Sequence, residues 1–304
     1  MNEFYIPSCG AGQIHVCRWE PEEPPRAIVQ ILHGIAEYGA RYDTFARYLN
    51  EQGYLVIADD HMGHGQSIGQ NGIRGYFHGG WYSAVDDSYR LMQQTMKEFP
   101  DLPYILFGHS MGSFMARTIL YRYPDSGIRA AVICGTGWQN PAVLQAGKLT
   151  AAAACRFEGE KTANPRMSKL MFGTYNKRVE HPRTAFDWLT RNEKIVDRYV
   201  EDPLCGFDPT NGLCRDMLFG IEQIQKKENL AKMNKALPVL FVAGGDDPVG
   251  AYGEGVRRAA DAFTRAGITD VTVKLYPMDR HEILNELNRD EVFSNIVDWM
   301  DKKI

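Results

Sequence analysis

Short apolar runs recur in the first and last parts of the chain and predict buried β-strands. They are nearly continuous and rich in β-branched or aromatic residues, and they lie at 27–32, 54–58, 104–107, 130–134, 239–243 and 271–276. A looser alternation of apolar and polar positions at 14–19 predicts one more strand, at a sheet edge. Continuous apolar strands are typical of sheets covered on both faces. The pattern therefore predicts a sheet between two layers of helices.

Helical stretches separate these runs. They are expected at 42–51, 81–99, 111–123, 254–266 and 291–301. Several of them stop at a residue that ends helices, namely Gly53, Pro100, Pro124 or Gly267. Strand and helix thus alternate along the chain, which predicts an α/β protein with a mostly parallel sheet and right-handed crossovers.

The alternation stops between about Thr136 and Leu237. Helix-like pieces follow one another there without an intervening strand, at 141–157, 165–172, 185–189, 193–200 and 217–229. A helical insertion between two strands predicts a cap over the C-terminal edge of the sheet. We therefore expect a core domain formed by 1–135 and 238–304, and a helical cap, or lid, at 136–237.

Composition narrows the class of protein. The chain has 304 residues, of which 44% are hydrophobic and 24% charged, as in a globular protein with a substantial core. A net charge of -4 argues against nucleic acid as a partner, because binding phosphates needs a basic surface. We expect neither a signal peptide nor a transmembrane segment. Six cysteines without a C-x-x-C predict free thiols and a cytoplasmic location. The sequence does not indicate an oligomeric state.

The most informative motif is Phe107-Gly108-His109-Ser110-Met111-Gly112-Ser113. It follows a predicted strand and precedes a predicted helix, which is the setting of a nucleophile elbow. Such a turn has a strained backbone that exposes the serine hydroxyl above the sheet. Glycines two residues to either side relieve crowding against the strand and the helix. The alternative is an ordinary glycine-bounded turn.

An acid and a histidine follow Ser110 in the order that this fold requires. Gly244-Gly245-Asp246-Asp247 comes after the strand at 239–243, and Asp279-Arg280-His281 comes after the strand at 271–276. A serine hydroxyl needs a base, and the base needs an acid that orients it. We predict Ser110 as nucleophile, His281 as base and Asp247 as acid, with Asp246 as the alternative acid.

The reaction also needs N–H donors for an oxyanion. One is expected from the backbone of Met111, directly after the nucleophile. The other is expected from the loop that begins Leu32-His33-Gly34-Ile35, where the N–H of Ile35 can face the site. His33 is then a residue that shapes this loop and not a second base.

These motifs together resemble the monoacylglycerol lipase and lysophospholipase-like branch of the α/β-hydrolase superfamily, which includes serine aminopeptidases of the S33 type. The resemblance rests on His33-Gly34-Ile35-Ala36-Glu37, on 60–67, on Gly108 to Gly112, on Gly244 to Asp247, on Arg280-His281-Glu282 and on Asp202-Pro203-Leu204. Tyr38 departs from the pattern, because many members have a histidine there.

The resemblance implies an α/β-hydrolase fold and a serine esterase. It implies no cofactor, and a small-molecule ester as substrate, with an acyl chain. We predict that Gly34, His109, Trp138 and Phe207 contact this substrate. Apolar cap residues are expected to line a channel for the acyl chain. Cys134 and residues 135–138 are expected either to line this pocket or to pack in the core.

Several alternatives stay open at this point. His61 and His64 could bind a metal ion, but no cluster with ligand-like spacing accompanies them, so we predict a structural turn and no metal site. The basic residues of the cap form a solvated face or contact a lipid surface transiently. A peptidase, a thioesterase and a non-catalytic binding protein of the same fold are the competing functions. Serine at position 110 disfavours an aspartate-nucleophile dehalogenase or epoxide hydrolase.

Overall fold

A computed structural model describes residues 1–68 and 72–304 of the chain, and its centre is an eight-stranded sheet in the order β1-β2-β4-β3-β5-β6-β7-β8. The strands are β1 (Asn2–Pro7), β2 (Gln13–Trp19), β3 (Ala27–Leu32), β4 (Tyr54–Asp59), β5 (Tyr104–His109), β6 (Ile128–Cys134), β7 (Val239–Gly244) and β8 (Val271–Tyr276). From β4 to β8 all neighbours are parallel, whereas β2 is antiparallel to both of its neighbours, β1 and β4. The predicted α/β fold with a mostly parallel sheet is confirmed.

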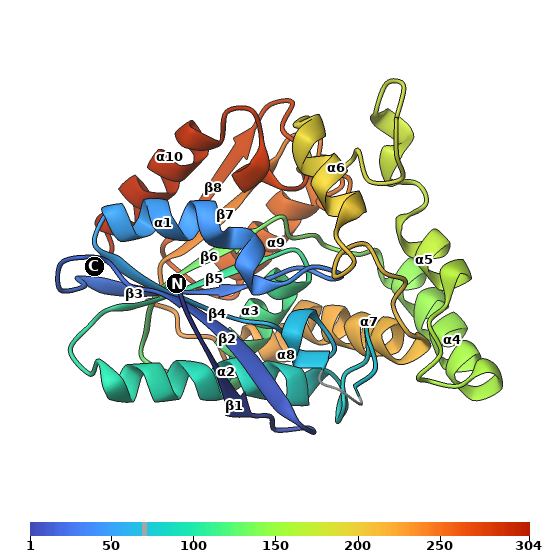
Figure 1. Cartoon of the computed structure of the whole chain (residues 1–304), viewed down its shortest axis with the longest axis horizontal. Helices are drawn as coiled ribbons and strands as arrows, with labels where there is room; N and C mark the ends of the chain where they lie inside the picture. Colours follow the sequence, from blue (N-terminus) through green and yellow to red (C-terminus); the bar gives the residue numbers. More distant parts are fainter. Residues whose placement is uncertain (69–71) are drawn as a thin grey trace.

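Helices cover both faces of the sheet (Figure 1). They are α1 (Asp43–Glu51), α2 (Gly80–Glu98), α3 (Met111–Arg122), α4 (Pro141–Glu158), α5 (Pro165–Phe172), α6 (Glu193–Glu201), α7 (Asn211–Gln225), α8 (Lys227–Leu230), α9 (Glu254–Arg265) and α10 (Arg289–Asp301). One apolar cluster joins α1 and α10 to the sheet, and another joins α2, α3, α7 and α9 to its other face. Alternate residues of a central strand serve the two clusters, as Ile28 and Val29 do in β3.

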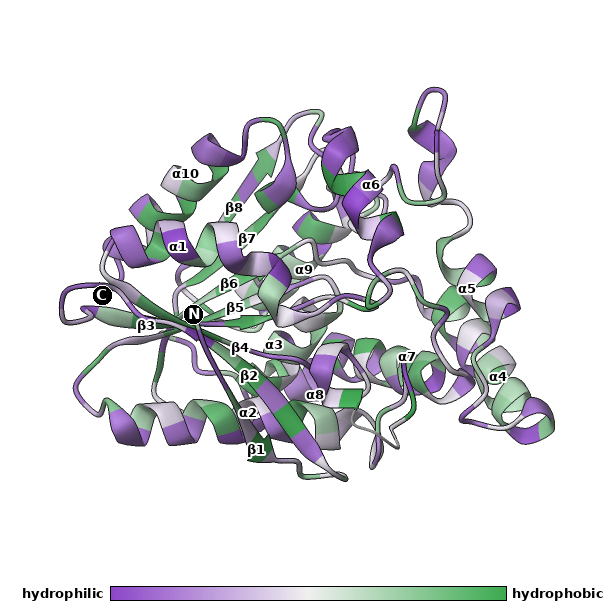
Figure 2. Ribbon diagram, viewed as in Figure 1, coloured by the Kyte–Doolittle hydropathy of each residue, from purple (hydrophilic) through white to green (hydrophobic). Residues whose placement is uncertain are grey.

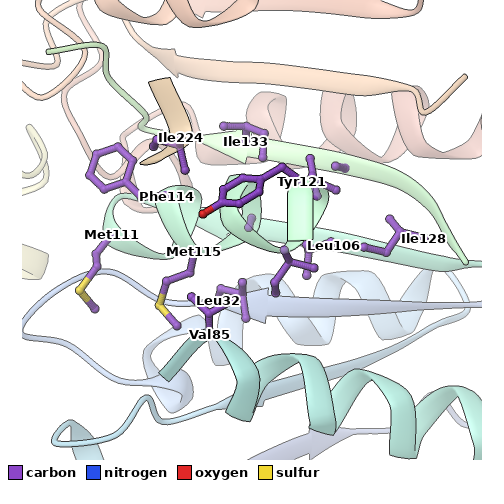
Figure 3. Packing of buried hydrophobic residues seen from close by; sticks show 14 of the residues in the cluster. Leu32, Val85, Leu106, Met111, Phe114, Met115, Tyr121, Ile128, Ile133 and Ile224 are labelled. Carbon is purple, nitrogen blue, oxygen red and sulfur yellow. The ribbon is translucent and has the colours of Figure 1, made fainter. Parts of the chain in front are cut away.

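The second of these clusters packs around α3 (Figure 3). Phe114 of α3 lies beside Ile224 of α7, and Met115 of α3 points toward Leu32 of β3 and Val85 of α2, all of them buried. Because so many apolar side chains surround α3 on several sides, this helix has almost no freedom to shift. The residue that begins it is therefore held in a fixed place above the sheet.

The first strand is the main element that the apolar pattern did not predict. Most side chains of β1 are exposed, so its sequence has no buried alternation to recognise. β1 pairs with β2, with Ile6 opposite Ile14. The strand predicted at 14–19 is therefore present, but its predicted place at the sheet edge is wrong, because β1 covers it.

The segment between β6 and β7 holds helices α4 to α8, and the predictions differ from the structure in two places. The single helix predicted at 217–229 is instead α7, which begins already at Asn211, followed by the separate helix α8. Residues 185–189 form turns and not a helix. Asp187 accepts a hydrogen bond from the backbone N–H of Thr184, and the carbonyl of Leu189 accepts one from the N–H of Glu282 at 2.6 Å. The N–H of Leu189 bonds to the carbonyl of Phe186, three residues back, at 2.9 Å, which is the pattern of a turn and not of an α-helix.

The two ends of this insertion differ in how they meet the sheet layers. Helices α4 and α5 extend away from the sheet at the right of Figure 1, while α7 packs against α2 and α3. At Gly220 of α7 the contact is so close that a Cβ atom would lie 2.2 Å from the Trp81 ring. The boundaries of a separate cap domain stay a prediction. In the described part of the chain, no helix has the length and apolarity that a membrane span requires.

Candidate active site

Ser110 forms the turn between β5 and α3. Its backbone has φ 54° and ψ -121°, a conformation that costs a non-glycine residue about 1–3 kcal/mol and that is typical of functional sites. The N–H of Ser110 donates to the carbonyl of Cys134 at 3.0 Å, and the hydroxyl of Ser113 donates to the carbonyl of Ser110 at 2.6 Å. These bonds hold the serine above the C-terminal ends of β5 and β6.

The two glycines of the motif let the backbones of β3, β5 and α3 approach one another closely. A Cβ atom on Gly108 would lie 2.4 Å from the carbonyl oxygen of Gly112. A Cβ atom on Gly112 would lie 2.0 Å from the carbonyl oxygen of Leu32 at the end of β3. Because both neighbours are backbone atoms and cannot rotate away, the spacing of the motif follows from packing alone.

We expect the Gly112→Ala variant to lose about 3 kcal/mol of unfolding free energy or to misfold, because its methyl group would overlap the carbonyl of Leu32. Urea denaturation measures the loss. Gly147→Ala in α4 is the matched control, since its Cβ atom would meet only Leu218, at 3.4 Å. That variant is expected to be neutral or stabilised by up to about 1 kcal/mol. Equal stability of both variants would contradict the packing argument.

Asp247 and His281 meet at the C-terminal edge of the sheet, in the loops that follow β7 and β8. Nδ1 of His281 lies 3.0 Å from Oδ2 of Asp247, both side chains are buried, and neither atom has another partner among the described residues. Asp246 is exposed and points elsewhere, so Asp247 is the carboxylate that contacts the histidine. Gly244 permits the meeting of the two loops, because a Cβ atom there would lie 2.1 Å from the carbonyl oxygen of Asp279.

The surroundings of His281 raise its pKa above the ordinary value. Burial alone lowers it, but the negative charge of Asp247 and the contact between the two groups outweigh burial. Glu282 and Glu37 act in the same direction. The neighbouring His109 ring lies 4.6 Å from that of His281, and burial keeps the pKa of His109 well below the ordinary value. The site thus pairs one histidine that accepts a proton readily with one that stays neutral.

The loop after β3 is fixed by a buried histidine. Nε2 of His33 lies 2.9 Å from the backbone N of His61, which can only donate, so this ring nitrogen accepts. Nδ1 of His33 then carries the proton and donates to the carbonyl of Gly34 at 2.7 Å. Burial lowers the pKa of His33 well below the ordinary value, so the ring is neutral. His33 shapes the loop of Gly34 and Ile35, as the sequence predicts.

A buried ion-pair network joins this loop to the loop of His281. The N–H of Gly34 donates to Glu37 at 2.6 Å, and Arg41 contacts both Glu37 and Glu282, the latter through two hydrogen bonds of 2.9 Å. Burial opposes ionisation of Glu282, but Arg41 outweighs it and lowers the pKa of this carboxyl group. The sequence motif contains Glu37 and Glu282, but their shared partner Arg41 is four residues beyond the motif and was not predicted.

A pocket lies beside Ser110 and His281. Its lining includes three of the predicted substrate contacts, Gly34, His109 and Phe207, as well as Ile35. Trp138, the fourth predicted contact, is not among the lining residues: it packs against the core beneath the Arg117 guanidinium, 5.7 Å away. Cys134 likewise lies in the core. The lining residues that the insertion contributes are largely apolar, and among them the sequence did not point to Ser168, Tyr199 or Gly206.

The side chains of His61 and His64 are engaged with partners inside the protein. Nδ1 of His61 lies 2.9 Å from Asp59, and Nδ1 of His64 contacts the carbonyl of Met62. Within residues 1–68 and 72–304 neither belongs to a group of donors close enough to share a metal ion. They brace the loop of His33, because the His33 and His61 rings stack at 3.9 Å.

The order of the strands and the helical insertion define the α/β-hydrolase class. Within this class, the family described as serine aminopeptidase, S33, matches residues 23–288, and the chain belongs to this family. Monoglyceride lipase of Homo sapiens is 29% identical over 96% of this chain and 88% of its own length. Monoacylglycerol lipase of Mycolicibacterium smegmatis is 27% identical, over 98% of this chain and 96% of its own length.

The solved structures agree with these relatives. A highly thermostable carboxyl esterase from Bacillus coagulans, crystallised in complex with glycerol, superposes with a TM-score of 0.92. It is 30% identical, and the match covers 99% of this chain and 98% of the esterase. The chain is a carboxylic ester hydrolase of the monoacylglycerol lipase-like branch of the superfamily.

Proposed function

We propose that this enzyme hydrolyses carboxylic esters through Ser110, His281 and Asp247. Ser110 and His281 line the same pocket, and because Nδ1 of His281 contacts Asp247, Nε2 is the nitrogen left to act on Ser110. His281 takes the hydroxyl proton of Ser110 while the oxygen attacks the ester carbonyl. The imidazolium returns this proton to the leaving alcohol. Water, activated by the same histidine, then releases the acid from the acyl-enzyme. The contact between His281 and Asp247 is the observation that carries this proposal.

The backbone N–H groups of Ile35 and Met111 are the proposed oxyanion donors. Met111 is the first residue of α3, where N–H groups have no partner within the helix and the helix dipole favours negative charge. Ile35 lines the pocket next to Gly34, and a Cβ atom on Gly34 would lie 3.1 Å from Cβ of Ser110. Both donors are fixed before the reaction, so they need no reorganisation in the transition state.

The proposed substrates are monoacylglycerols or lysophospholipid-like esters. Phe172, Phe186, Trp188, Leu189 and Phe207 give the pocket an apolar lining that suits an acyl chain. The names of the relatives from Homo sapiens and Mycolicibacterium smegmatis support a monoacylglycerol. No metal or cofactor is part of this proposal.

Helices α4 and α5 expose apolar side chains beyond the pocket. Leu149, Phe157 and Leu170 are 73%, 80% and 62% exposed, and Arg156, Arg166 and Lys169 are exposed beside them. In Figure 2 much of α4 is green or pale, although it lies at the periphery of the molecule. Apolar side chains flanked by cations suit transient contact with an anionic lipid surface. We include this contact in the proposal.

A substrate panel tests the proposal. We expect hydrolysis of p-nitrophenyl esters and of monoacylglycerols, with kcat/KM higher for glycerides than for acyl thioesters or aminoacyl amides of equal length. The panel is measured with and without anionic phosphatidylglycerol vesicles, which are expected to raise the rate for long acyl chains only. Cleavage of thioesters or amides in preference to esters would contradict the proposed substrate class.

The peptidase alternative has little support in the insertion. A peptidase would need acidic groups there to hold the amino terminus of its substrate, and residues 158–160 are the candidate of this kind that the sequence offers. Glu160 accepts from Tyr76 and Arg215, however, and Glu158 accepts from Asn164. Neither lines the pocket beside Ser110. A substrate amino terminus would therefore meet no free carboxylate from this pair.

A further inference from the structure

The part of the insertion that directly precedes α6 lies on the loop of His281. The carbonyls of Trp188 and Leu189 accept hydrogen bonds from the N–H groups of His281 and Glu282, at 3.4 and 2.6 Å. The Arg280 guanidinium donates to the carbonyl of Asp187 at 2.6 Å. The Trp188 ring also lies 5.1 Å from that of His281. The base and the residues directly before and after it, Arg280 and Glu282, are thus all bonded to this part of the insertion.

Arg191 is the charged centre of this contact. Its guanidinium donates to Asp279 at 2.6 Å and to Glu286 at 2.9 Å, and its backbone N–H also donates to Glu286. Both carboxylate side chains are fully buried. Burial and the neighbouring Glu286 raise the pKa of Asp279 to about 6, against the opposing effect of Arg191. Without Arg191, two buried carboxylates would repel each other two residues from the base.

Residues 199–206, at and after the end of α6, contact the loop after β3 that carries the proposed oxyanion donor Ile35. The hydroxyl of Tyr199 and the N–H of Gly206 both donate to the carbonyl of Ala36, each at 3.0 Å. Ala36 has φ 56°, a strained conformation for a residue with a Cβ atom. The hydroxyl of Tyr38 adds a hydrogen bond to Asp202 at 2.7 Å. The conformation of the residue after Ile35 therefore depends on the insertion.

We propose that residues 187–206 form a clamp that sets the position of the base relative to the oxyanion donor. In this clamp Arg191 is a positioning residue for His281, and Tyr199 is a positioning residue for the N–H of Ile35. Neither touches the reacting atoms. Within the insertion, the clamp is fixed to the catalytic loops, whereas helices α4 and α5 extend away from the sheet. The proposal rests on the proposed function of Ser110, His281 and Asp247.

Kinetics of Tyr199→Phe and Arg191→Met with a short p-nitrophenyl ester test the clamp. Each variant is expected to lower kcat by about tenfold or more, with KM changed by less than about twofold, because the lost contacts orient groups that act in the transition state. The matched controls are Tyr123→Phe, whose hydroxyl contacts Asp86, and Arg183→Met, whose partners Asp197 and Glu193 are exposed. Both controls are expected to keep the wild-type kcat.

A double variant distinguishes the role of Arg191 in positioning His281 from its role in neutralising the buried carboxylates of Asp279 and Glu286. Arg191→Met/Asp279→Asn removes one of the two unpaired carboxylates and is expected to regain thermal stability while kcat stays low. Hydrogen exchange of the Glu282 amide is expected to be faster in Arg191→Met and in the double variant, a readout independent of activity. Unchanged kcat in both single variants, or recovery of kcat together with stability in the double variant, would overturn the clamp. Absence of ester turnover by the wild type would overturn the proposed function instead.

Discussion

Replacing Ser110 by alanine is expected to reduce kcat for ester hydrolysis by at least about a thousandfold while the fold is retained. The hydroxyl is the proposed nucleophile, and no other side chain can take its place on the turn between β5 and α3. The remaining rate reflects binding and the oxyanion donors. Steady-state kinetics with a p-nitrophenyl ester, together with a thermal unfolding curve, measure both effects.

Ser113→Ala is the matched control for this experiment. The Ser113 hydroxyl is buried and donates to the carbonyl of Ser110, so the substitution removes a serine from the same turn without removing the nucleophile. It is expected to lower stability by about 1 kcal/mol and to retain far more activity than Ser110→Ala. A Ser110→Ala variant that keeps more than a tenth of the wild-type kcat would refute the assigned nucleophile.

Asp247→Asn is expected to lower kcat/KM by about a thousandfold or more, whereas Asp246→Asn leaves it nearly unchanged. The asparagine side chain lacks the charge that stabilises the imidazolium, and it can present an N–H group to Nδ1 of His281. Asp246 is exposed and serves as the matched control on the adjacent residue. Equal losses in the two variants would contradict the assignment of the acid.

The pH dependence of the residual Asp247→Asn activity gives a second, independent readout. Asp247 raises the pKa of His281, while burial lowers it. Without the carboxylate only the lowering effect of burial and the smaller effects of Glu282 and Glu37 remain, so the pKa falls. Because His281 must be neutral to accept a proton, the acid limb of the profile of kcat/KM is expected to move to lower pH. A limb that stays in place or moves to higher pH would contradict the pairing.

Much of the site could be predicted because its residues follow directly from strand ends. Ser110 and Asp247 follow the buried strands β5 and β7, and parallel strands bring their C-terminal ends to one edge of the sheet. His281 follows β8, which was predicted as a buried strand but lies at the sheet edge with most of its side chains not buried. The packing around Gly112 and Gly244 likewise leaves a trace in the sequence, since only glycine permits the close backbone contacts there.

The insertion was less predictable because its role depends on contacts between distant segments. Residues 185–189 have a helix-like composition, but their carbonyls bond to the loop of His281 and the segment forms turns. Trp138 follows a strand beside the elbow, yet it packs beneath Arg117 and not in the pocket. Arg41, Arg191 and Tyr199 act through partners far away in the chain, and a single sequence contains no periodicity that relates such partners.

Mass spectrometry of protein treated with a fluorophosphonate tests the nucleophile most directly. In this reaction the Ser110 oxygen bonds to phosphorus, fluoride leaves, and the hydroxyl proton passes to His281. We expect one phosphonyl adduct per chain, on the peptide that contains Ser110, formed in proportion to the loss of ester hydrolysis and absent from the Ser110→Ala variant. An adduct on another residue that accompanies full inactivation, or full inactivation of hydrolysis without an adduct on Ser110, would contradict it.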